Sequence, residues 1–148
     1  MNDASSMQTA QTLAEQVRDT MLLTDAAAKM MGMQVLAVSP GHATVTMTVR
    51  TDMLNGFGVC QGGLVTTLAD MAFAYACNSY NEATVASGFD VNLLAPSRAG
   101  DVLTATAGVV SQAGRVGLYD VEVRNQSGVR VAAFRGRSYR LKGKPVVT

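Results

Sequence analysis

The stretch from Gly62 to Asn81, GGLVTTLADMAFAYACNSYN, constrains the fold more than any other part of the chain. Its Ala, Leu and Met content and its apolar residues at i, i+3 and i+4 predict a helix that is buried on most of its faces. Two glycines begin it and a polar segment ends it. Because such a helix must be covered on most sides, we expect the rest of the chain to wrap around it.

Asp70 is the only charged residue between Met53 and Asn81. An ionised carboxylate in apolar surroundings costs several kcal/mol unless it is paired or hydrogen-bonded. Two interpretations are open. Asp70 either caps another segment or pairs with a distant arginine, or it is a desolvated carboxylate whose pKa is tuned for chemistry. A membrane-spanning helix is the weaker alternative, because the apolar run is short and carries an acid at its centre.

The segments on both sides of this helix predict an α+β fold. Residues 7–31 have the pattern of an amphipathic helix that Thr24 or Asp25 could divide in two. Alternating apolar residues and short glycine-containing turns then predict six strands. Their expected ranges are 33–39, 42–51, 84–95, 101–112, 115–125 and 129–141. The simplest arrangement is one curved antiparallel sheet around the central helix, with an N-terminal helical segment outside it.

Composition restricts the kinds of partner. The 148 residues suit a single domain, 1–148, with residues 1–24 as a variable N-terminal helix or tail. Only 16% of the residues are charged, which favours a subunit interface, and the net charge of +1 argues against nucleic-acid binding. Two cysteines without CxxC spacing and an N-terminus unlike a signal peptide predict a cytoplasmic protein without a membrane anchor.

Several kinds of chemistry lack the residues they need. The chain has one histidine, His42, beside a turn, so a Ser-His-Asp or Cys-His arrangement and a histidine-rich metal site are not expected. No glycine-rich nucleotide loop is present. Cys60 precedes the central helix and could be a reactive thiol, whereas Cys77 is expected in the core. Asp70 remains as the candidate acid, base or nucleophile.

Gly62 and Gly63 offer a second candidate element. A helix N-terminus presents unpaired N–H groups that can stabilise a developing oxyanion, although a plain glycine helix start is an equally good interpretation. Asp70 lies eight residues later, about 12 Å along a helix axis. One small carbonyl cannot touch both, so we expect Gly62 and Asp70 of one site to come from different subunits of a two-fold dimer.

The string LNGFGVCQGGLVTTLADMAFAYACNS resembles the active-site segment of the hotdog-fold thioesterases, specifically of the phenylacetate-pathway PaaI group. The later segments LLAPSRAGDVLTATA and AAFRGRSYRL are similar to that group too. The resemblance runs from about Asp25 to Leu141. It implies a hotdog fold, a dimer of dimers with sites at the subunit interface, and hydrolysis of acyl-coenzyme A thioesters. Phenylacetyl-CoA and hydroxyphenylacetyl-CoA are the implied substrates, and coenzyme A enters as part of the substrate rather than as a cofactor.

The resemblance also assigns roles within the motif. Asp70 matches the nucleophile or general base, Gly62 the residue whose N–H polarises the thioester carbonyl, and Asn55 the loop amide that orients substrate or water. Gln61 stands where the family usually has histidine. Gln61 can form hydrogen bonds but cannot carry a proton at neutral pH, so a slower enzyme or a non-catalytic acyl-CoA binding protein is the alternative.

Four further residues are expected to contact substrate or coenzyme A: Gly63, Phe57, Ser87 and Arg98. The resemblance matches a water-binding Ser or Thr of some relatives to Ala86, with Ser87 next to it. Arg98 is preferred among four arginines that could hold the phosphates, the others being Arg115, Arg135 and Arg137. A hotdog dehydratase or hydratase ranks below a thioesterase, because those sites pair a carboxylate with a histidine and His42 lies far from the motif.

Overall fold

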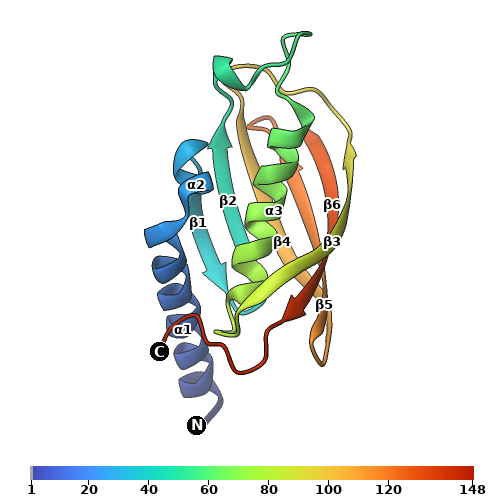
Figure 1. The fold of residues 1–148 in the computed structure, drawn as a ribbon. Helices are drawn as coiled ribbons and strands as arrows, with labels where there is room; N and C mark the ends of the chain where they lie inside the picture. Colours follow the sequence, from blue (N-terminus) through green and yellow to red (C-terminus); the bar gives the residue numbers. More distant parts are fainter. Residues whose placement is uncertain (1) are drawn as a thin grey trace.

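One antiparallel sheet curves around a single long helix in the computed structural model, which describes residues 2–148 (Figure 1). The helices are α1 (Asn2–Thr24), α2 (Ala26–Met30), the short 3-10 helix η1 (Thr51–Met53) and α3 (Gly62–Asn78). The strands are β1 (Gln34–Ser39), β2 (His42–Thr48), β3 (Thr84–Leu93), β4 (Val102–Ala113), β5 (Val116–Arg124) and β6 (Arg130–Arg140). The element order is the predicted one.

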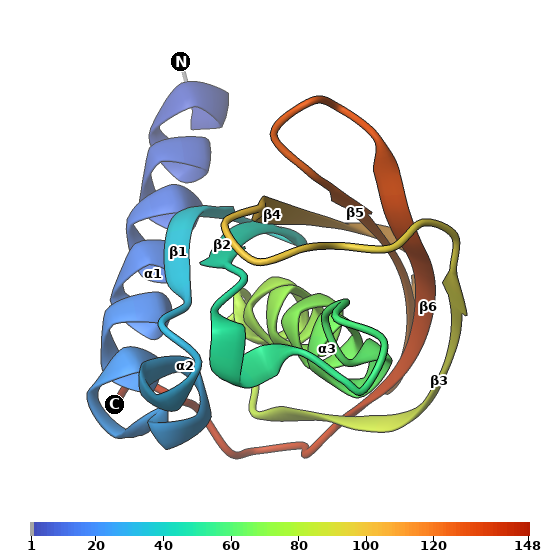
Figure 2. The ribbon, with the colours of Figure 1, turned by 90° about the horizontal axis from the view of Figure 1, so that it is seen from above.

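The sheet has the strand order β1-β2-β4-β5-β6-β3, with every neighbouring pair antiparallel. The connection from β2 to β3 contains α3 and carries the chain across to the far edge of the sheet. Figure 2 shows the sheet curling around α3 when the molecule is seen from above. The predicted α+β hotdog arrangement is therefore confirmed.

The core forms where α3 meets the concave face of the sheet. Leu68, Ala72 and Phe73 of α3 are at most 1% exposed. The Phe73 ring lies against Gly136 of β6, where an added Cβ would be 2.8 Å from the ring. A glycine in β6 thus makes room for an aromatic side chain of the helix, which explains why a strand interior tolerates it here.

The predicted break in the N-terminal helical segment lies at Asp25. Its Oδ1 accepts the N–H of Ala28 at 3.0 Å and so caps α2. Its Oδ2 accepts the Tyr75 hydroxyl at 2.9 Å, which ties α3 to the start of α2. Burial and this hydrogen bond raise the pKa of Tyr75, so the phenol stays protonated.

The two edges of the sheet differ. α1 runs along β1, and Gln11 Nε2 donates to the Val38 carbonyl at 2.9 Å (Figures 1 and 2). At the other edge, β3 carries exposed large apolar side chains: Val85, Phe89 and Leu93. A long apolar edge strand is a template for pairing with another chain.

Some boundaries differ from the prediction. α3 ends at Asn78 rather than Asn81, because the Asn78 side chain bonds both backbone groups of Thr84 and turns the chain into β3. Asn81 has φ 61°, a left-handed conformation that no helix continues. α1 begins earlier than expected, at Asn2. Among residues 2–148, no helix is long and apolar enough to cross a membrane.

Candidate active site

The loop before α3 is a tight turn held by Asn55. Its backbone N–H donates to the Val59 carbonyl at 2.8 Å, and its Oδ1 accepts the N–H of Phe57 at 2.9 Å and of Val59 at 3.4 Å. The glycine needed here is Gly58, which has φ 74°. Turn formation therefore occupies the Asn55 oxygen. Its amino group has no acceptor within residues 2–148.

The N-terminus of α3 presents free backbone donors. The carbonyl of Gln61 accepts the N–H of Leu64 at 2.9 Å and of Val65 at 3.3 Å. The N–H groups of Gly62 and Gly63 have no acceptor in the part of the chain that is described. Together with the helix dipole, these donors form a site suited to a developing negative charge.

A cavity of about 290 Å³ lies beside these donors. Its walls are mostly apolar, with polar groups from a few residues. The lining residues are Asn55, Val59, Cys60, Gly62, Val65, Leu93, Leu94, Ala95, Pro96, Ser97 and Val131. A Cβ on Gly62 would collide with the Leu93 side chain, so the glycine keeps this wall and the helix start in contact. An apolar cavity with a few convergent polar groups is the usual form of a small-molecule site.

Asp70 lies two helical turns beyond Gly62 and is half-buried. Burial raises the pKa of its carboxyl above the ordinary value of 3.8. Within residues 2–148 it makes no ion pair and no hydrogen bond. The interpretation of Asp70 as a cap or as the partner of a distant arginine thus finds no support, and a desolvated carboxylate is what the chain presents.

Gly62 and Asp70 do not meet in one chain. Both belong to the uninterrupted helix α3, and eight residues separate them by about 12 Å. The cavity lining includes Gly62 but not Asp70. The continuous helix therefore keeps the two residues apart, and the site of a single chain has no carboxylate.

The other sequence-predicted residues fall into two groups. Asn55 and Gly62 line the cavity, whereas Gln61 and Gly63 lie beside it at the helix start. Both of these residues are exposed. Phe57 is 92% exposed at the tip of the loop. Ser87 sits in a bulge of β3, exposed, and its hydroxyl donates to the Arg137 carbonyl at 3.1 Å. The structure thus does not bring Phe57 and Ser87 to the cavity of their own chain.

Of the four candidate arginines, three have partners. Arg135 pairs with Asp120 and Arg137 with Asp90, while Arg115 donates to the Tyr139 hydroxyl. Arg98 follows Ser97 of the cavity wall. Its guanidinium has no ion pair or hydrogen bond to the described residues, and Arg98 does not itself line the cavity, so its role stays a prediction.

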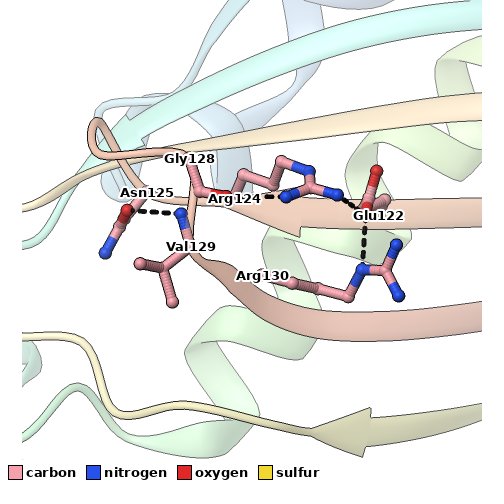
Figure 3. Close-up of polar contacts among 6 residues, drawn as sticks. All are labelled: Glu122, Arg124, Asn125, Gly128, Val129 and Arg130. Atoms are coloured by element: carbon pink, nitrogen blue, oxygen red, sulfur yellow. Dashed lines mark hydrogen bonds and ion pairs between the residues drawn. The ribbon is translucent and has the colours of Figure 1, made fainter.

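The convex face of the sheet carries the densest charge. Figure 3 shows Glu122 accepting hydrogen bonds from both Arg124 and Arg130, next to a turn in which Asn125 accepts the Val129 N–H. A hollow of about 510 Å³ on this face is larger than the cavity at Gly62. Its charged groups are largely paired with each other, and neither Gly62 nor Asp70 lines it. We therefore place the site at the smaller cavity.

Two alternatives based on other residues lose support. His42 is exposed at the start of β2, with Nδ1 3.0 Å from the Pro40 carbonyl oxygen, and does not line the cavity. Cys60 lines the cavity, but burial raises the pKa of its thiol, which disfavours a reactive thiolate. Cys77 is buried as expected, and its pKa is raised to about 12.

Sequence reasoning missed part of the cavity wall. Leu93 is the last residue of β3, Leu94 and Ser97 come from the connection after it, and Val131 comes from the start of β6. Ser97 stands in a Pro-Ser-Arg segment that looks like an exposed loop, yet it is 2% exposed. The cause is a distant contact, because the Ser97 carbonyl accepts the Cys60 N–H at 2.8 Å.

Comparison with known proteins gives the class of protein. Residues 57–132, slightly more than half of the chain, match the family model of the Thioesterase superfamily. The chain is 50% identical over 119 residues to the acyl-coenzyme A thioesterase PaaI of Escherichia coli K12, covering 80% of this chain and 85% of the relative. The chain therefore belongs to the Thioesterase superfamily, and the prediction of a thioesterase is confirmed.

Solved structures place the chain more closely within that class. The structure of the Escherichia coli PaaI protein from the phenylacetic acid degradation operon matches with a TM-score of 0.89 and 46% identity, over 93% of this chain and 99% of that one. The Streptococcus mutans protein smu.793, solved with bound acetyl-CoA, matches with a TM-score of 0.73 and 25% identity. The match covers 76% of this chain and 90% of that one. The resemblance to the PaaI group is thereby confirmed.

Proposed function

We propose that this protein hydrolyses acyl-CoA thioesters with an arylacetyl group, phenylacetyl-CoA or hydroxyphenylacetyl-CoA, to the free acid and coenzyme A. The observation that carries the proposal is the free N–H of Gly62 beside an apolar cavity, on the same helix as the unpaired, half-buried Asp70. The similarity to the Escherichia coli thioesterase PaaI supports the choice of thioester.

In the proposed reaction, the Gly62 N–H donates to the thioester carbonyl oxygen and stabilises the oxyanion as it forms. The Asp70 carboxylate then acts in one of two ways. As nucleophile it attacks the carbonyl carbon, the C–S bond breaks, the thiolate of coenzyme A leaves, and water hydrolyses the mixed anhydride. As general base it takes a proton from water, the hydroxide attacks the carbonyl carbon, and the C–S bond then breaks so that the thiolate of coenzyme A leaves. Because a thiolate leaves readily, neither route needs a histidine as acid.

The proposal requires two chains, because Gly62 and Asp70 of one chain are too far apart. The apolar edge strand β3 supports a dimer in which two copies pair edge to edge about a two-fold axis. Such pairing sets the two α3 helices antiparallel and opposes Gly62 of one copy to Asp70 of the other. Two dimers then form the proposed tetramer.

Four residues complete the proposed site. The free amino group of Asn55 orients the substrate or the water, and Gln61 takes the position of the family histidine as a hydrogen-bonding residue. Arg98 binds a phosphate of coenzyme A. Gly63 contributes the second free N–H of the helix start. The exposed Phe57 and Ser87 contribute only where a partner chain brings them to its own site.

The alternative is an acyl-CoA binding protein without turnover. One observation favours it: the Gln61 side chain has no hydrogen-bond partner within residues 2–148, so nothing prepares it for a role in proton transfer. The Streptococcus mutans relative was solved with acetyl-CoA bound. The alternative predicts saturable binding of acyl-CoA and no release of thiol.

Release of free thiol from phenylacetyl-CoA, its ring-hydroxylated analogues and a short aliphatic acyl-CoA tests the proposal. We expect release by the native chain and at least a 100-fold loss in Asp70→Asn, which keeps the shape of the side chain but removes the base. Near-normal activity of Asp70→Asn would contradict the proposal. Binding without release by the native chain would favour the alternative.

We also propose a cytoplasmic location for the protein. Its two free cysteines agree with a reducing compartment.

A further inference from the structure

Phe89 in β3 carries an aromatic ring that is packed on one face and exposed on the other. The ring stacks on Phe134 of β6, with the two ring centroids 4.9 Å apart and the planes at 30°. Phe134 in turn packs against Phe73 of α3, with 5.8 Å between the centroids. Phe134 and Phe73 are buried, whereas Phe89 is 40% exposed. The aromatic rings of the core thus continue to an accessible ring at the edge of the sheet.

The Phe89 side chain lies on the concave face of the sheet, which is the face that α3 covers. Its Cα partner in β6 is Gly136, and the Phe73 ring of the helix lies over that glycine. Side chains of a strand stand roughly perpendicular to the sheet, so the Phe89 ring does not point outward from the edge. Edge pairing of two β3 strands uses their backbone groups, and the ring stays on the helix side of the sheet.

Two contacts place Phe89 level with Asp70 along the axis of α3. The helix and β3 run in opposite directions (Figure 1), and Gly62 packs against Leu93 where the helix begins and the strand ends. The strand from Leu93 back to Phe89 spans about 13 Å. About the same length of helix from Gly62 reaches the turn that contains Asp70. The second contact agrees, because Phe73, one turn after Asp70, packs on the strand position opposite Phe89.

Asp70 also lies on the same side of α3 as Phe73. Residues three apart in an α-helix differ by about 60° around its axis, so both side chains lie on the flank toward β6 and β3. Asp70 is half-buried, and it makes no ion pair or hydrogen bond within residues 2–148. Its carboxyl group and the exposed face of the Phe89 ring therefore border the same space between α3 and the edge of the sheet.

The position of the cavity decides which end of the substrate meets Phe89. In the proposed two-chain site, the carbonyl lies between Gly62 of one copy and Asp70 of the other. The cavity lies on the Gly62 side, and Arg98, proposed to bind a phosphate, follows Ser97 of its wall. The coenzyme A arm therefore occupies that side, and the acyl group extends along the Asp70 side to Phe89.

We propose that Phe89 is a specificity-determining residue whose exposed face stacks against an aromatic ring of the acyl group. This inference rests on the proposed function and deepens it, because the chain that supplies Asp70 also supplies Phe89. A flat ring extends the stack that Phe89 already forms with Phe134. A saturated ring of similar size gains the apolar contact but not the stacking, so the site distinguishes the two.

The first experiment compares kcat/KM for phenylacetyl-CoA with kcat/KM for cyclohexylacetyl-CoA, whose saturated ring has the same number of carbon atoms. We expect the native chain to prefer the aromatic substrate. Phe89→Leu keeps an apolar side chain and should lose about fivefold of that preference, whereas Phe89→Tyr keeps the aromatic face and should retain it. Tyr139→Leu is the matched control. It removes an exposed aromatic ring from the convex face and should leave the preference unchanged.

A second readout does not require turnover. Binding of the two thioesters is measured on Asp70→Asn and on Asp70→Asn/Phe89→Leu. The second protein should lose about fivefold more affinity for phenylacetyl-CoA than for cyclohexylacetyl-CoA. If the native chain binds but cleaves nothing, the proposed hydrolysis fails, while this comparison still decides the role of Phe89.

Three results would overturn the inference. Equal losses on both thioesters would show that Phe89 supports the reacting centre or the packing. A native chain without the aromatic preference, or an unchanged preference in Phe89→Leu, would show that the ring does not stack on the acyl group. Dissociation of Phe89→Leu into monomers in analytical ultracentrifugation would show that the exposed face of the ring packs against the partner chain instead.

Discussion

Gly62 packs directly against Leu93, so closely that a Cβ on the glycine would overlap the leucine side chain. Both residues line the cavity at the start of α3. The glycine therefore has a specific reason to be there, beyond being a flexible start of a helix. It lets the wall of the cavity and the free N–H group lie next to each other.

This contact predicts the effect of Gly62→Ala. The added methyl group must push Leu93 away or displace the helix start, which misplaces the N–H that donates to the carbonyl. Alanine keeps the N–H but misplaces it, and complete loss of one oxyanion donor typically costs about 100-fold, so we expect kcat to fall by up to that factor. In Gly62→Ala/Leu93→Ala the space is restored, and at least a tenfold recovery is expected. No recovery in the double variant, measured by thiol release, would show that the contact is not the cause.

Asp70→Asn should stabilise the protein at neutral pH. Burial raises the pKa of the Asp70 carboxyl in the folded chain above the ordinary value of 3.8. Between 3.8 and the raised pKa, the folded state holds a proton that the unfolded state has lost, so stability falls as pH rises through that window. We expect a higher Tm for Asp70→Asn at pH 7 and a difference that narrows toward pH 3.8. An equal or lower Tm at neutral pH would mean that the ionised carboxylate is stabilised in the folded protein.

Asn55 has two functions that two substitutions can separate. Asn55→Asp keeps an oxygen that accepts the Phe57 N–H but removes the free amino group, so activity should fall about 10- to 100-fold with little change in Tm. Asn55→Ala also removes the loop hydrogen bonds, and it should cost about 1–2 kcal/mol of stability in addition. Unfolding in urea and thiol release measure the two effects. Full activity of Asn55→Asp would show that the Asn55 amino group has no role in the reaction.

Arg98 should act on the coenzyme A part of the substrate only. Arg98→Gln is expected to raise KM for an acyl-CoA about tenfold through the loss of a phosphate contact, while kcat changes little. The same acyl group on N-acetylcysteamine, which lacks the phosphates, should be hydrolysed equally by both proteins. Arg18→Gln, which removes an arginine of α1 paired with Asp19, serves as the control for charge. An equal effect on both thioesters would place Arg98 at the acyl end.

The fold could be predicted from the sequence because the segment with the strongest pattern, α3, also lies at the centre of the structure. A helix as apolar as α3 needs a surrounding sheet, and the short turns left few ways to build one. The same pattern isolated Asp70, since no other charge lies near it in the chain. Gly62 followed from the type of residue at a helix start, whereas the role of Asn55 was implied by the resemblance to the PaaI group, and both roles stay predictions.

The parts that sequence reasoning missed depend on contacts between distant segments. Ser97 is buried only because the loop before α3 bonds to its carbonyl, 37 residues away along the chain. Tyr75 and Asp25 are 50 residues apart, and neither has a local pattern that reveals their hydrogen bond. Phe57, which was predicted to contact the substrate, is directed to solvent by the Asn55 turn in a single chain.

The proposed site is shared between two chains, and mixing two inactive variants tests this most directly. One variant carries Gly62→Ala and the other Asp70→Asn, and the two are co-expressed with different tags in equal amounts. In a mixed dimer, one site receives both substitutions and the other receives neither. With half of the dimers mixed, about a quarter of native activity should return. Activity no higher than that of either variant alone would show that Gly62 and Asp70 do not act across two chains, and would contradict the shared site.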